Sequence, residues 1–355
     1  MERILIIRTS AIGDVIFASP LVGALRQRYP EAHIAWLAEP PVRDMLSRHP
    51  DLDEVIVWDK ARWRALWRER RFRTLGREAR AFLRELRARR FDTAIDAQGL
   101  LKSGVWAWAS GASRRIGLGS REGSRYLMTE VIDKPAASDR IGFEYRELAR
   151  RLGLETRPFP MRVGVSPEDE KAARSLLHDR GVAGDYVVFC PFTTRPQKHW
   201  FDESWRALAK RLQRETGLPA IMLGGPADRP AAAELAGDSA IIDLAGETSI
   251  PQAAAIISRC RLLIGVDTGL THLGTAFERP TVCLFGSTRP YLRTDSALTT
   301  VIHHPRDCSP CRRNPTCGGA FTCMREITPE AVVREVHRLM VRPGPRPDSD
   351  TMTVL

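Results

Sequence analysis

Long hydrophobic runs are absent from this 355-residue sequence. No stretch reaches the roughly 18 apolar residues that span a bilayer. The apolar segment 4–7 is too short for a signal peptide, and it lacks the basic region and the cleavage site that accompany one. We therefore expect a cytoplasmic chain without a transmembrane segment, either free or resting on a membrane surface.

Cysteine is scarce as well, with seven residues in the chain. Disulfides rarely persist in the cytoplasm, so we expect reduced thiols. Four of the seven fall close together: Cys308, Cys311, Cys317 and Cys323. The leading C-x2-C is a usual zinc half-site, but the remaining spacing departs from the common paired pattern. We expect no bound metal, and structural zinc at these four residues is the alternative.

Acidic residues are outnumbered, 43 against 54 Lys and Arg, which leaves a net charge of +11. Most of the surplus lies in segment 60–90, which has thirteen Lys or Arg and three Glu. Such an excess indicates an anionic partner, namely nucleic acid, a membrane surface or a phosphorylated substrate. No helix-turn-helix or aromatic nucleic-acid signature accompanies the charge, so we expect no nucleic acid. Trp63 and Trp67 either pack inside or touch a lipid interface, and one side of the segment is predicted to be buried: Phe82, Leu83 and Leu86.

Short apolar segments alternate with amphipathic helical patterns in two series. The first series has expected strands at 4–7, 33–37, 55–57 and 93–95. The second has them at 186–189, 220–223, 241–243, 262–264 and 282–285. This alternation is typical of parallel sheets covered by helices, and so it predicts an α/β fold.

The alternation weakens around residues 155–185, between the two series. We predict two doubly wound, Rossmann-like domains, 1–165 and 166–341, and a disordered tail, 342–355, that is rich in proline and aspartate. A chain of this length, 43% hydrophobic, can give each domain its own core. Ligands of such sheets bind where strands end, so we expect the chemistry in loops that follow strands and in a cleft between the domains.

The first apolar run lacks the dinucleotide spacing G-x-G-x-x-G, and Asp14 instead follows Gly13 directly. One interpretation is a helix N-cap, because Asp accepts hydrogen bonds from first-turn amides and suits the helix dipole. The other is a general base that takes a proton from a substrate. Both hold together only if the carboxylate keeps an exposed oxygen.

Two loops of the second series carry groups suited to an anionic ligand. In "CPFTTRPQKHW" (190–200), the hydroxyls of Thr193 and Thr194 and the charge of Lys198 suit phosphate oxygens. The alternative is a polar turn anchored by Trp200. After the segment 262–264, the sequence "VDTGLTHL" begins a helix whose first amides form an anion site.

Three residues of the second loop need separate interpretations. Gly269 lets a ligand approach the backbone. Asp267 would cap the turn and orient Thr268, or bond a ligand hydroxyl. His272, one turn into the helix, is interpreted first as a buried, satisfied histidine. Asp228, after Gly224-Gly225-Pro226, either bonds a ribose or base edge or starts the next helix.

Four segments occur together in one known family: "TSAIGDVIFASP", "IDAQGLLKS", "TTRPQKHW" and "VDTGLTHL". In this order they resemble the ADP-heptose:lipopolysaccharide heptosyltransferases of glycosyltransferase family 9, from about residue 3 to residue 340. The resemblance implies a GT-B fold of two Rossmann-like domains. It also implies an inverting transfer without a metal, with ADP-heptose held by the C-terminal domain and the acceptor by the N-terminal domain.

The resemblance also assigns roles to single residues. Asp14 matches the catalytic carboxylate, which would deprotonate the acceptor hydroxyl, and Lys198 would stabilise the charge that grows on ADP. The residues that match donor-binding positions are Thr193, Thr194, Lys198, Asp267, Thr268, Gly269 and His272, with Asp228 near the adenosine in a looser alignment. The residues that resemble acceptor-side cations are Arg62, Arg64 and Lys102.

Within the family, the tryptophan-flanked arginines resemble the first heptosyltransferase, which acts on the Kdo sugar of Kdo-lipid A. That acceptor carries carboxylates and phosphates, which would account for the basic segment. The cysteine segment 308–323 instead resembles enzymes that add a second heptose, so a heptosyltransferase II or III stays open. A nucleotide-sugar epimerase of the same architecture and a nucleic-acid-binding protein are further alternatives. We expect a monomer, peripheral on the cytoplasmic face of the inner membrane.

Overall fold

The structure, a computed structural model, describes residues 1–136, 138–311 and 314–341. The chain divides into two compact units. Unit 1 comprises Met1–Ser138 and Gly142–Gly164, and unit 2 comprises Asp139–Ile141 and the chain from Val165 onward. The tail predicted at 342–355 lies outside the described residues.

Unit 1 contains a sheet of six parallel strands in the order β3-β2-β1-β4-β5-β6. The strands are β1 (Arg3–Ile7), β2 (His33–Ala38), β3 (Glu54–Val57), β4 (Thr93–Asp96), β5 (Arg114–Leu118) and β6 (Glu130–Ile132). Residues Ile4 to Ile7 of the central strand β1 are fully buried, because helices cover both faces of a parallel sheet.

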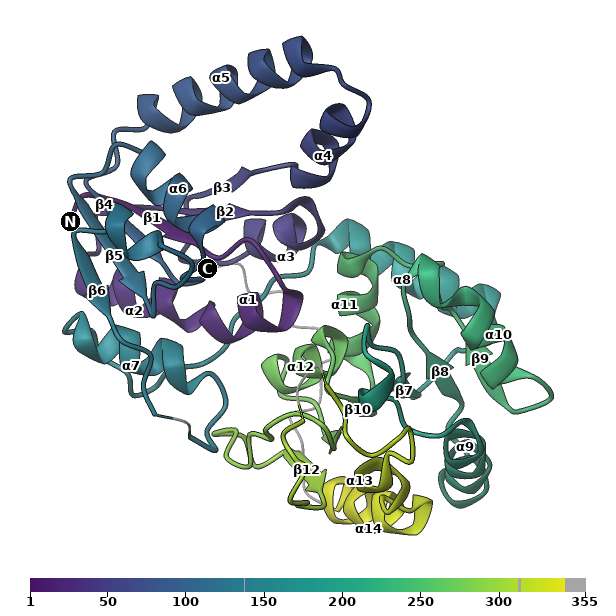
Figure 1. Ribbon diagram of the computed structural model, residues 1–355. Coiled ribbons are helices and arrows are strands. Elements are labelled where there is room, and N and C mark those ends of the chain that lie inside the picture. Colours follow the sequence, from purple (N-terminus) through teal and green to yellow (C-terminus); the bar gives the residue numbers. More distant parts are fainter. Residues whose placement is uncertain (137, 312–313, 342–355) are drawn as a thin grey trace. The chain divides into compact units, whose positions relative to one another are not determined.

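The helices of unit 1 lie in two layers. On one face of the sheet lie α4 (Lys60–Arg68), α5 (Phe72–Ala88) and α6 (Leu101–Ala109) (Figure 1). On the other face lie α1 (Ile12–Ala18), α2 (Pro20–Arg28) and α7 (Phe143–Arg151). Shorter elements connect them: η1 (Pro40–Val42), α3 (Arg43–Ser47) and η2 (Ser124–Leu127).

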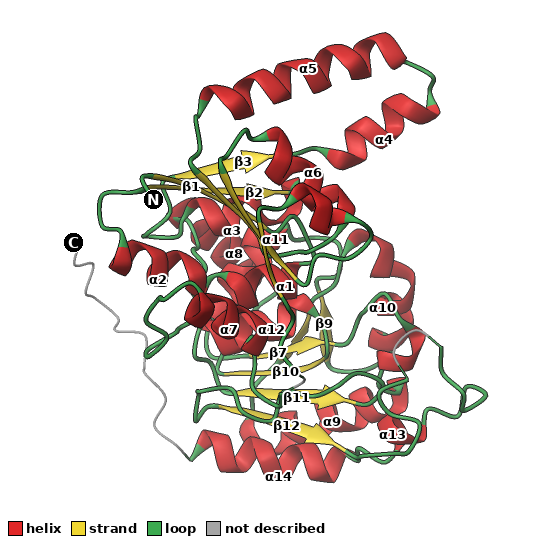
Figure 2. Cartoon of the chain, turned by 60° about the vertical axis from the view of Figure 1, so that its left-hand side comes forward, coloured by secondary structure: helices red, strands yellow, loops and turns green. Residues whose placement is uncertain are grey.

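Unit 2 repeats this plan with the strand order β12-β11-β10-β7-β8-β9, again all parallel (Figure 2). Its strands are β7 (Val187–Cys190), β8 (Ala220–Met222), β9 (Ile241–Asp243), β10 (Leu262–Val266), β11 (Thr281–Phe285) and β12 (Thr299–His303). Its helices are α8 (Pro167–Asp179), α9 (Asp202–Thr216), α10 (Arg229–Ala236), α11 (Ile250–Arg259), α12 (Gly269–Ala276), α13 (Thr322–Arg325) and α14 (Pro329–Met340). Two 3-10 turns, η3 (Pro196–Lys198) and η4 (Pro226–Asp228), follow β7 and β8. The predicted α/β, doubly wound fold class is confirmed.

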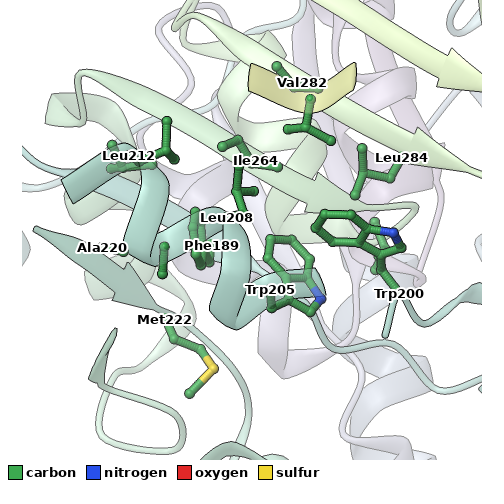
Figure 3. Packing of buried hydrophobic residues seen from close by; sticks show 14 of the residues in the cluster. Phe189, Trp200, Trp205, Leu208, Leu212, Ala220, Met222, Ile264, Val282 and Leu284 are labelled. Atoms are coloured by element: carbon green, nitrogen blue, oxygen red, sulfur yellow. The ribbon is translucent and has the colours of Figure 1, made fainter. Parts of the chain in front are cut away.

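The core of unit 2 anchors the loop that follows β7. Trp205 of α9 is fully buried, and its ring lies 4.9 Å from that of Phe189 and 5.0 Å from that of Trp200 (Figure 3). Trp200 also donates a hydrogen bond of 2.8 Å from Nε1 to the carbonyl oxygen of Ile327. Trp200 therefore fixes one end of the loop 191–199 beneath the surface, as the polar-turn interpretation of that loop proposed.

The sequence pattern missed three strands that the structure contains: β5, β6 and β12. β6 and β12 each lie at one of the two edges of their sheet, whereas β5 lies inside its sheet. All five residues of β12 are only partly buried, and β5 begins with the arginines 114 and 115. A strand that is covered on fewer sides needs fewer apolar residues, so its sequence carries a weaker signal.

Candidate active site

In unit 2, the residues predicted to bind the donor lie in loops that follow neighbouring strands. One loop follows β7, one follows β8, and one follows β10. The strand order reverses at β7, because β8 and β9 extend the sheet on one side of it and β10, β11 and β12 on the other. Such a switch point is where doubly wound proteins bind ligands, since the loops diverge there at the carboxyl ends of the strands.

Lys198 and Asp267 form an ion pair at this switch point. Lys198 Nζ lies 2.5 Å from Asp267 Oδ2, and it donates a further hydrogen bond of 3.2 Å to the backbone oxygen of Asp267. Both side chains are 16% exposed, so bulk water screens their attraction weakly. An acid beside a predicted phosphate-binding loop looks misplaced in the sequence, and the structure shows that it pairs with the lysine.

Asp267 is held from two further sides. Thr288 Oγ1 donates a hydrogen bond of 2.7 Å to Oδ2, and His272 Nε2 lies 3.3 Å from Oδ1. Burial by itself raises the pKa of this carboxyl, but the hydrogen bond and charge of His272 and the charge of Lys198 together hold the pKa well below its usual range. Asp267 therefore carries a fixed negative charge at neutral pH.

A buried hydrogen-bonded chain stands behind Asp267. His272 is 4% exposed, and its Nδ1 lies 2.8 Å from the hydroxyl of Tyr291. That hydroxyl lies 3.4 Å from the thiol of Cys283. Both ring nitrogens of His272 therefore have polar partners, Asp267 at Nε2 and Tyr291 at Nδ1. The interpretation of His272 as a buried, satisfied histidine is confirmed.

Thr288 and Tyr291 are the residues that the sequence reasoning missed. Both lie in the loop that follows β11, and β11 pairs directly with β10, which carries Asp267. The available signal was the polar segment directly after the apolar run 281–285. It went unused because only the strand order shows that this loop adjoins the one after β10.

The remaining donor-side residues lie nearby along the same loops. Thr193 is partly buried, and its carbonyl oxygen lies 2.8 Å from His199 Nε2, whereas Thr194 is exposed. Thr268 is the N-cap residue of α12 and Gly269 is the first residue of that helix. The side chain of Thr268 makes no capping hydrogen bond. Its hydroxyl is therefore not committed to the helix start.

Asp228 closes the turn after β8. Its Oδ2 accepts a hydrogen bond of 2.8 Å from the backbone N–H of Gly225. Asp228 also occupies the N-cap position of α10, although its side chain makes no capping bond to that helix. The carboxylate thus shapes the Gly-Gly-Pro turn with one oxygen, and its other oxygen takes no part in that bond.

In unit 1, Asp14 lies in the first turn of α1. The N-cap of this helix is Ala11, so the N-cap interpretation of Asp14 is wrong. Its Oδ2 forms a salt bridge with Nη2 of Arg8, whose side chain is 10% exposed, while the side chain of Asp14 is 41% exposed. Arg8 directly follows β1 and pairs with this carboxylate, which stays accessible to an incoming group.

The loop that follows β4 supports the loop that follows β1. Gln98 Oε1 accepts hydrogen bonds from the backbone N–H and the hydroxyl of Thr9, at 3.1 and 3.0 Å. Asp96, fully buried, accepts bonds of 3.0 Å from the N–H groups of Gln98 and Gly99. β1 and β4 are neighbours at the point where the strand order of this sheet reverses, so the motif "IDAQGLLKS" braces the backbone near Asp14.

Lys102 lies beside this braced loop. Its Nζ is 3.8 Å from Glu39 Oε1, and Lys60 Nζ lies 4.0 Å from the same oxygen. Burial and then the neighbouring charge of Lys60 lower the pKa of Lys102. Two cations that share one carboxylate leave an excess of positive charge, which suits an anionic group on a ligand.

Arg62 and Arg64, the other two predicted acceptor cations, both lie in α4. Arg62, in α4, donates to both carboxylate oxygens of Glu78 in α5, at 2.6 Å from Nη2 and 3.0 Å from Nε. Arg64 is exposed and forms no ion pair with any residue that the structure describes. In this arrangement Arg62 joins two helices, and Arg64 points a free charge to solvent.

The four clustered cysteines line one small cavity of about 140 Å³: Cys308, Cys311, Cys317 and Cys323. Across the described ranges 1–136, 138–311 and 314–341, no three His, Cys, Asp or Glu side chains are arranged to hold a metal ion.

The sequence motifs and the two-unit fold are both found in one family of known proteins. The sequence model of glycosyltransferase family 9 (heptosyltransferase) matches residues 79–319, more than half of the chain. The chain belongs to this family. It is therefore a glycosyltransferase.

Curated relatives of two kinds are similar to this glycosyltransferase. Lipopolysaccharide heptosyltransferase 1 of Salmonella typhimurium strain LT2 is 30% identical over 298 residues, 82% of this chain and 90% of that protein. Lipopolysaccharide heptosyltransferase 2 of the same strain is 29% identical over 364 residues, 96% of this chain and 99% of that protein. Identities of 30% and 29% do not distinguish a heptosyltransferase 1 from a heptosyltransferase 2.

A solved structure shares the architecture. An Escherichia coli heptosyltransferase with ADP-2-deoxy-2-fluoro heptose matches with a TM-score of 0.70 at 27% identity, over 95% of this chain and 99% of that chain. The GT-B fold class, with two Rossmann-like units, is therefore shown for this chain. No helix within the described residues combines the length and the apolar character that a bilayer crossing needs.

Proposed function

We propose that this family 9 member is an inverting, metal-independent heptosyltransferase. It transfers heptose from ADP-heptose to the Kdo region of the lipopolysaccharide inner core, with Kdo-lipid A as acceptor. The observation that carries the proposal is the chemistry at the two switch points. Unit 1 presents an open carboxylate, Asp14, held by Arg8, and unit 2 presents a cation, Lys198, oriented by Asp267.

The donor side is built for a diphosphate leaving group. Lys198 neutralises the negative charge that develops on ADP, and the first amides of α12, at Gly269, add hydrogen bonds. Thr193 and Thr194 contribute hydroxyls to the phosphate oxygens. Because both ring nitrogens of His272 are engaged, this residue acts on the donor through Asp267. Asp228 faces the adenosine with the oxygen that the turn leaves free.

The transfer is a single displacement. Asp14 removes the proton from the acceptor hydroxyl as its oxygen attacks the anomeric carbon of heptose. The bond from that carbon to the diphosphate breaks, the electron pair leaves with ADP, and the configuration at carbon inverts. Lys198 and the helix amides supply the positive charge that a metal would otherwise provide.

The acceptor side draws on the cations of unit 1. Lys102 and Arg64 bind carboxylates or phosphates of the acceptor. Arg62 binds the acceptor as well when it releases Glu78, its present partner. A lipid acceptor requires that the enzyme work at a membrane surface, so we place it peripherally on the cytoplasmic face of the inner membrane, as a monomer.

A competition between acceptors tests the proposal. The enzyme is incubated with ADP-heptose and an equimolar mixture of Kdo-lipid A and its monoheptosylated form, and the products are resolved by mass spectrometry. We expect heptose to be added to Kdo-lipid A first. Preferential addition to the monoheptosylated form would establish the second candidate, a transferase for a later heptose, which is a candidate because the chain is also 29% identical to a heptosyltransferase 2 over 96% of its length.

A further inference from the structure

Two large aromatic side chains are exposed where α4 passes into α5. Trp67 is 64% exposed and Phe72 is 52% exposed. Their rings lie 5.2 Å apart, edge to face, so each ring covers part of the other and the pair forms one apolar knob. Trp63, one turn earlier in α4, instead packs against Phe82 and Trp106, with centroids 5.9 and 5.8 Å away.

Arginines flank the two rings of this knob in the sequence. Five of them are exposed: Arg64, Arg68, Arg70, Arg71 and Arg73. Of these, only Arg71 has an ion pair with a residue that the structure describes, at 3.5 Å from Glu69. The segment therefore combines a two-ring apolar knob with four cations whose charge no described carboxylate balances.

The helical hairpin presents this knob in a fixed place. Arg62 and Glu78 form a two-point salt bridge between α4 and α5, and Trp63 and Phe82 pack together beneath it. Asp59 caps α4 by accepting a hydrogen bond of 2.8 Å from the backbone N–H of Arg62. In both views, the loop that joins the two helices points away from the sheet of unit 1 (Figures 1 and 2).

An anionic bilayer matches both halves of this surface. Tryptophan and other aromatic rings prefer the level of the lipid headgroups, which has acyl chains on one side and water on the other. Arginines beside them meet lipid phosphates, and each contributes about 1 kcal/mol near an anionic surface. Packing inside the protein does not explain why these two large rings are present, because neither ring contacts the aromatic cluster around Trp63.

We propose that the tip of the α4–α5 hairpin, formed by Trp67, Phe72 and the arginines around them, docks this enzyme on an anionic bilayer. The rings enter the headgroup layer and the arginines bind lipid phosphates. The link to catalysis rests on the proposed function, because docking matters for transfer only if the acceptor is anchored in lipid.

Flotation of the full-length enzyme with vesicles tests the docking. The vesicles are phosphatidylethanolamine with phosphatidylglycerol, and pure phosphatidylcholine vesicles serve as the neutral comparison. We expect binding to the anionic vesicles only. Arg68→Gln with Arg73→Gln should lower the partition coefficient about thirty-fold, since two contributions of about 1 kcal/mol are lost and 1.4 kcal/mol is tenfold. Trp67→Ser with Phe72→Ser should lower it at least tenfold.

A matched variant tests whether another apolar surface is responsible. Trp108 and Tyr126 are 53% and 87% exposed elsewhere in unit 1. Trp108→Ser with Tyr126→Ser should bind the anionic vesicles as the wild type does. Loss of binding in this variant with retention in the hairpin variants would overturn the proposal, and so would equal binding by all variants. Binding to an RNA or DNA oligonucleotide without binding to vesicles would overturn it as well.

A second readout separates docking from transfer. With an acceptor stripped of its acyl chains and free in solution, the hairpin variants should transfer heptose at the wild-type rate. With the acceptor embedded in anionic vesicles, their rate should fall in proportion to the lost binding. Equal loss in both assays would overturn the docking role. Failure of the wild type with both acceptors would refute the proposed function, while the flotation result would still decide the docking.

Discussion

Replacing Asp267 with Asn tests the idea that this acid orients Lys198. The substitution keeps the shape and an acceptor for Thr288, but it removes the charge that faces Lys198 at 2.5 Å. Removing one partner of a buried ion pair costs about 3–5 kcal/mol, because the other charge is left uncompensated. Both side chains here retain 16% exposure, so we expect the low end, about 3 kcal/mol.

The same substitution should change the response to acid. The pKa of Asp267 is lower in the folded protein than in the unfolded chain. The ionised carboxylate therefore stabilises the folded state above the unfolded pKa, about 4, and this stabilisation is lost as the pH falls below it. Between pH 5 and pH 2 the wild type should lose stability more steeply than Asp267→Asn.

Urea denaturation at several pH values measures the loss of stability and its dependence on pH. Calorimetric titration measures the affinity of the enzyme for ADP. The exposed Asp238→Asn provides a matched control, which should stay within about 0.5 kcal/mol of the wild type. We expect Asp267→Asn to weaken ADP binding as well, because Lys198 loses its fixed position. Unchanged ADP affinity together with unchanged unfolding would refute the orienting role of Asp267.

Three further predictions follow from single contacts. Lys198→Ala should weaken ADP-heptose binding and slow transfer together, as steady-state kinetics would show, and unchanged kinetics would exclude a diphosphate role. Lys102→Ala should raise the KM for the acceptor and leave that for ADP-heptose unchanged, whereas an equal rise in both would indicate misfolding. Trp205→Ala should lower the free energy of unfolding by about 3–5 kcal/mol, since it empties a fully buried site. A loss below 1 kcal/mol in urea denaturation would show that the core of unit 2 does not depend on this ring.

Much of the fold could be predicted because its central strands are nearly continuous apolar runs. Ile4–Ile7 and Leu262–Ile264 are covered on both faces, and their sequences show it. β6 and β12 escaped because polar residues interrupt them, so that each has only two consecutive apolar residues. Their presence depends on pairing with a neighbour, which a local pattern does not record.

The candidate site could be predicted only as separate loops. Lys198 and Asp267 each stood out beside a strand, but their pairing depends on β7 and β10 being neighbours. The roles of Thr288 and Tyr291 depend in the same way on β11 lying next to β10. Residue type and spacing therefore locate the chemistry, whereas strand order decides which groups meet.

In the basic segment 60–90, too, the sequence locates the residues and the fold decides their contacts. Its two tryptophans are alike in the sequence, and packing separates them: Trp63 joins an aromatic cluster and Trp67 stays exposed. Arg62, which resembles an acceptor cation, is engaged by Glu78 sixteen residues away. A helical break at 69–71 brings these two residues together, and charge counting alone gives no sign of it.

The most direct test of the central claim compares the wild type with Asp14→Ala. Each is incubated with ADP-heptose and Kdo-lipid A, the products are followed by mass spectrometry over time, and the ADP affinity of each is measured by calorimetry. The account predicts that the wild type adds one heptose and that Asp14→Ala adds none, with ADP affinity nearly intact. Turnover by Asp14→Ala within tenfold of the wild type would contradict it.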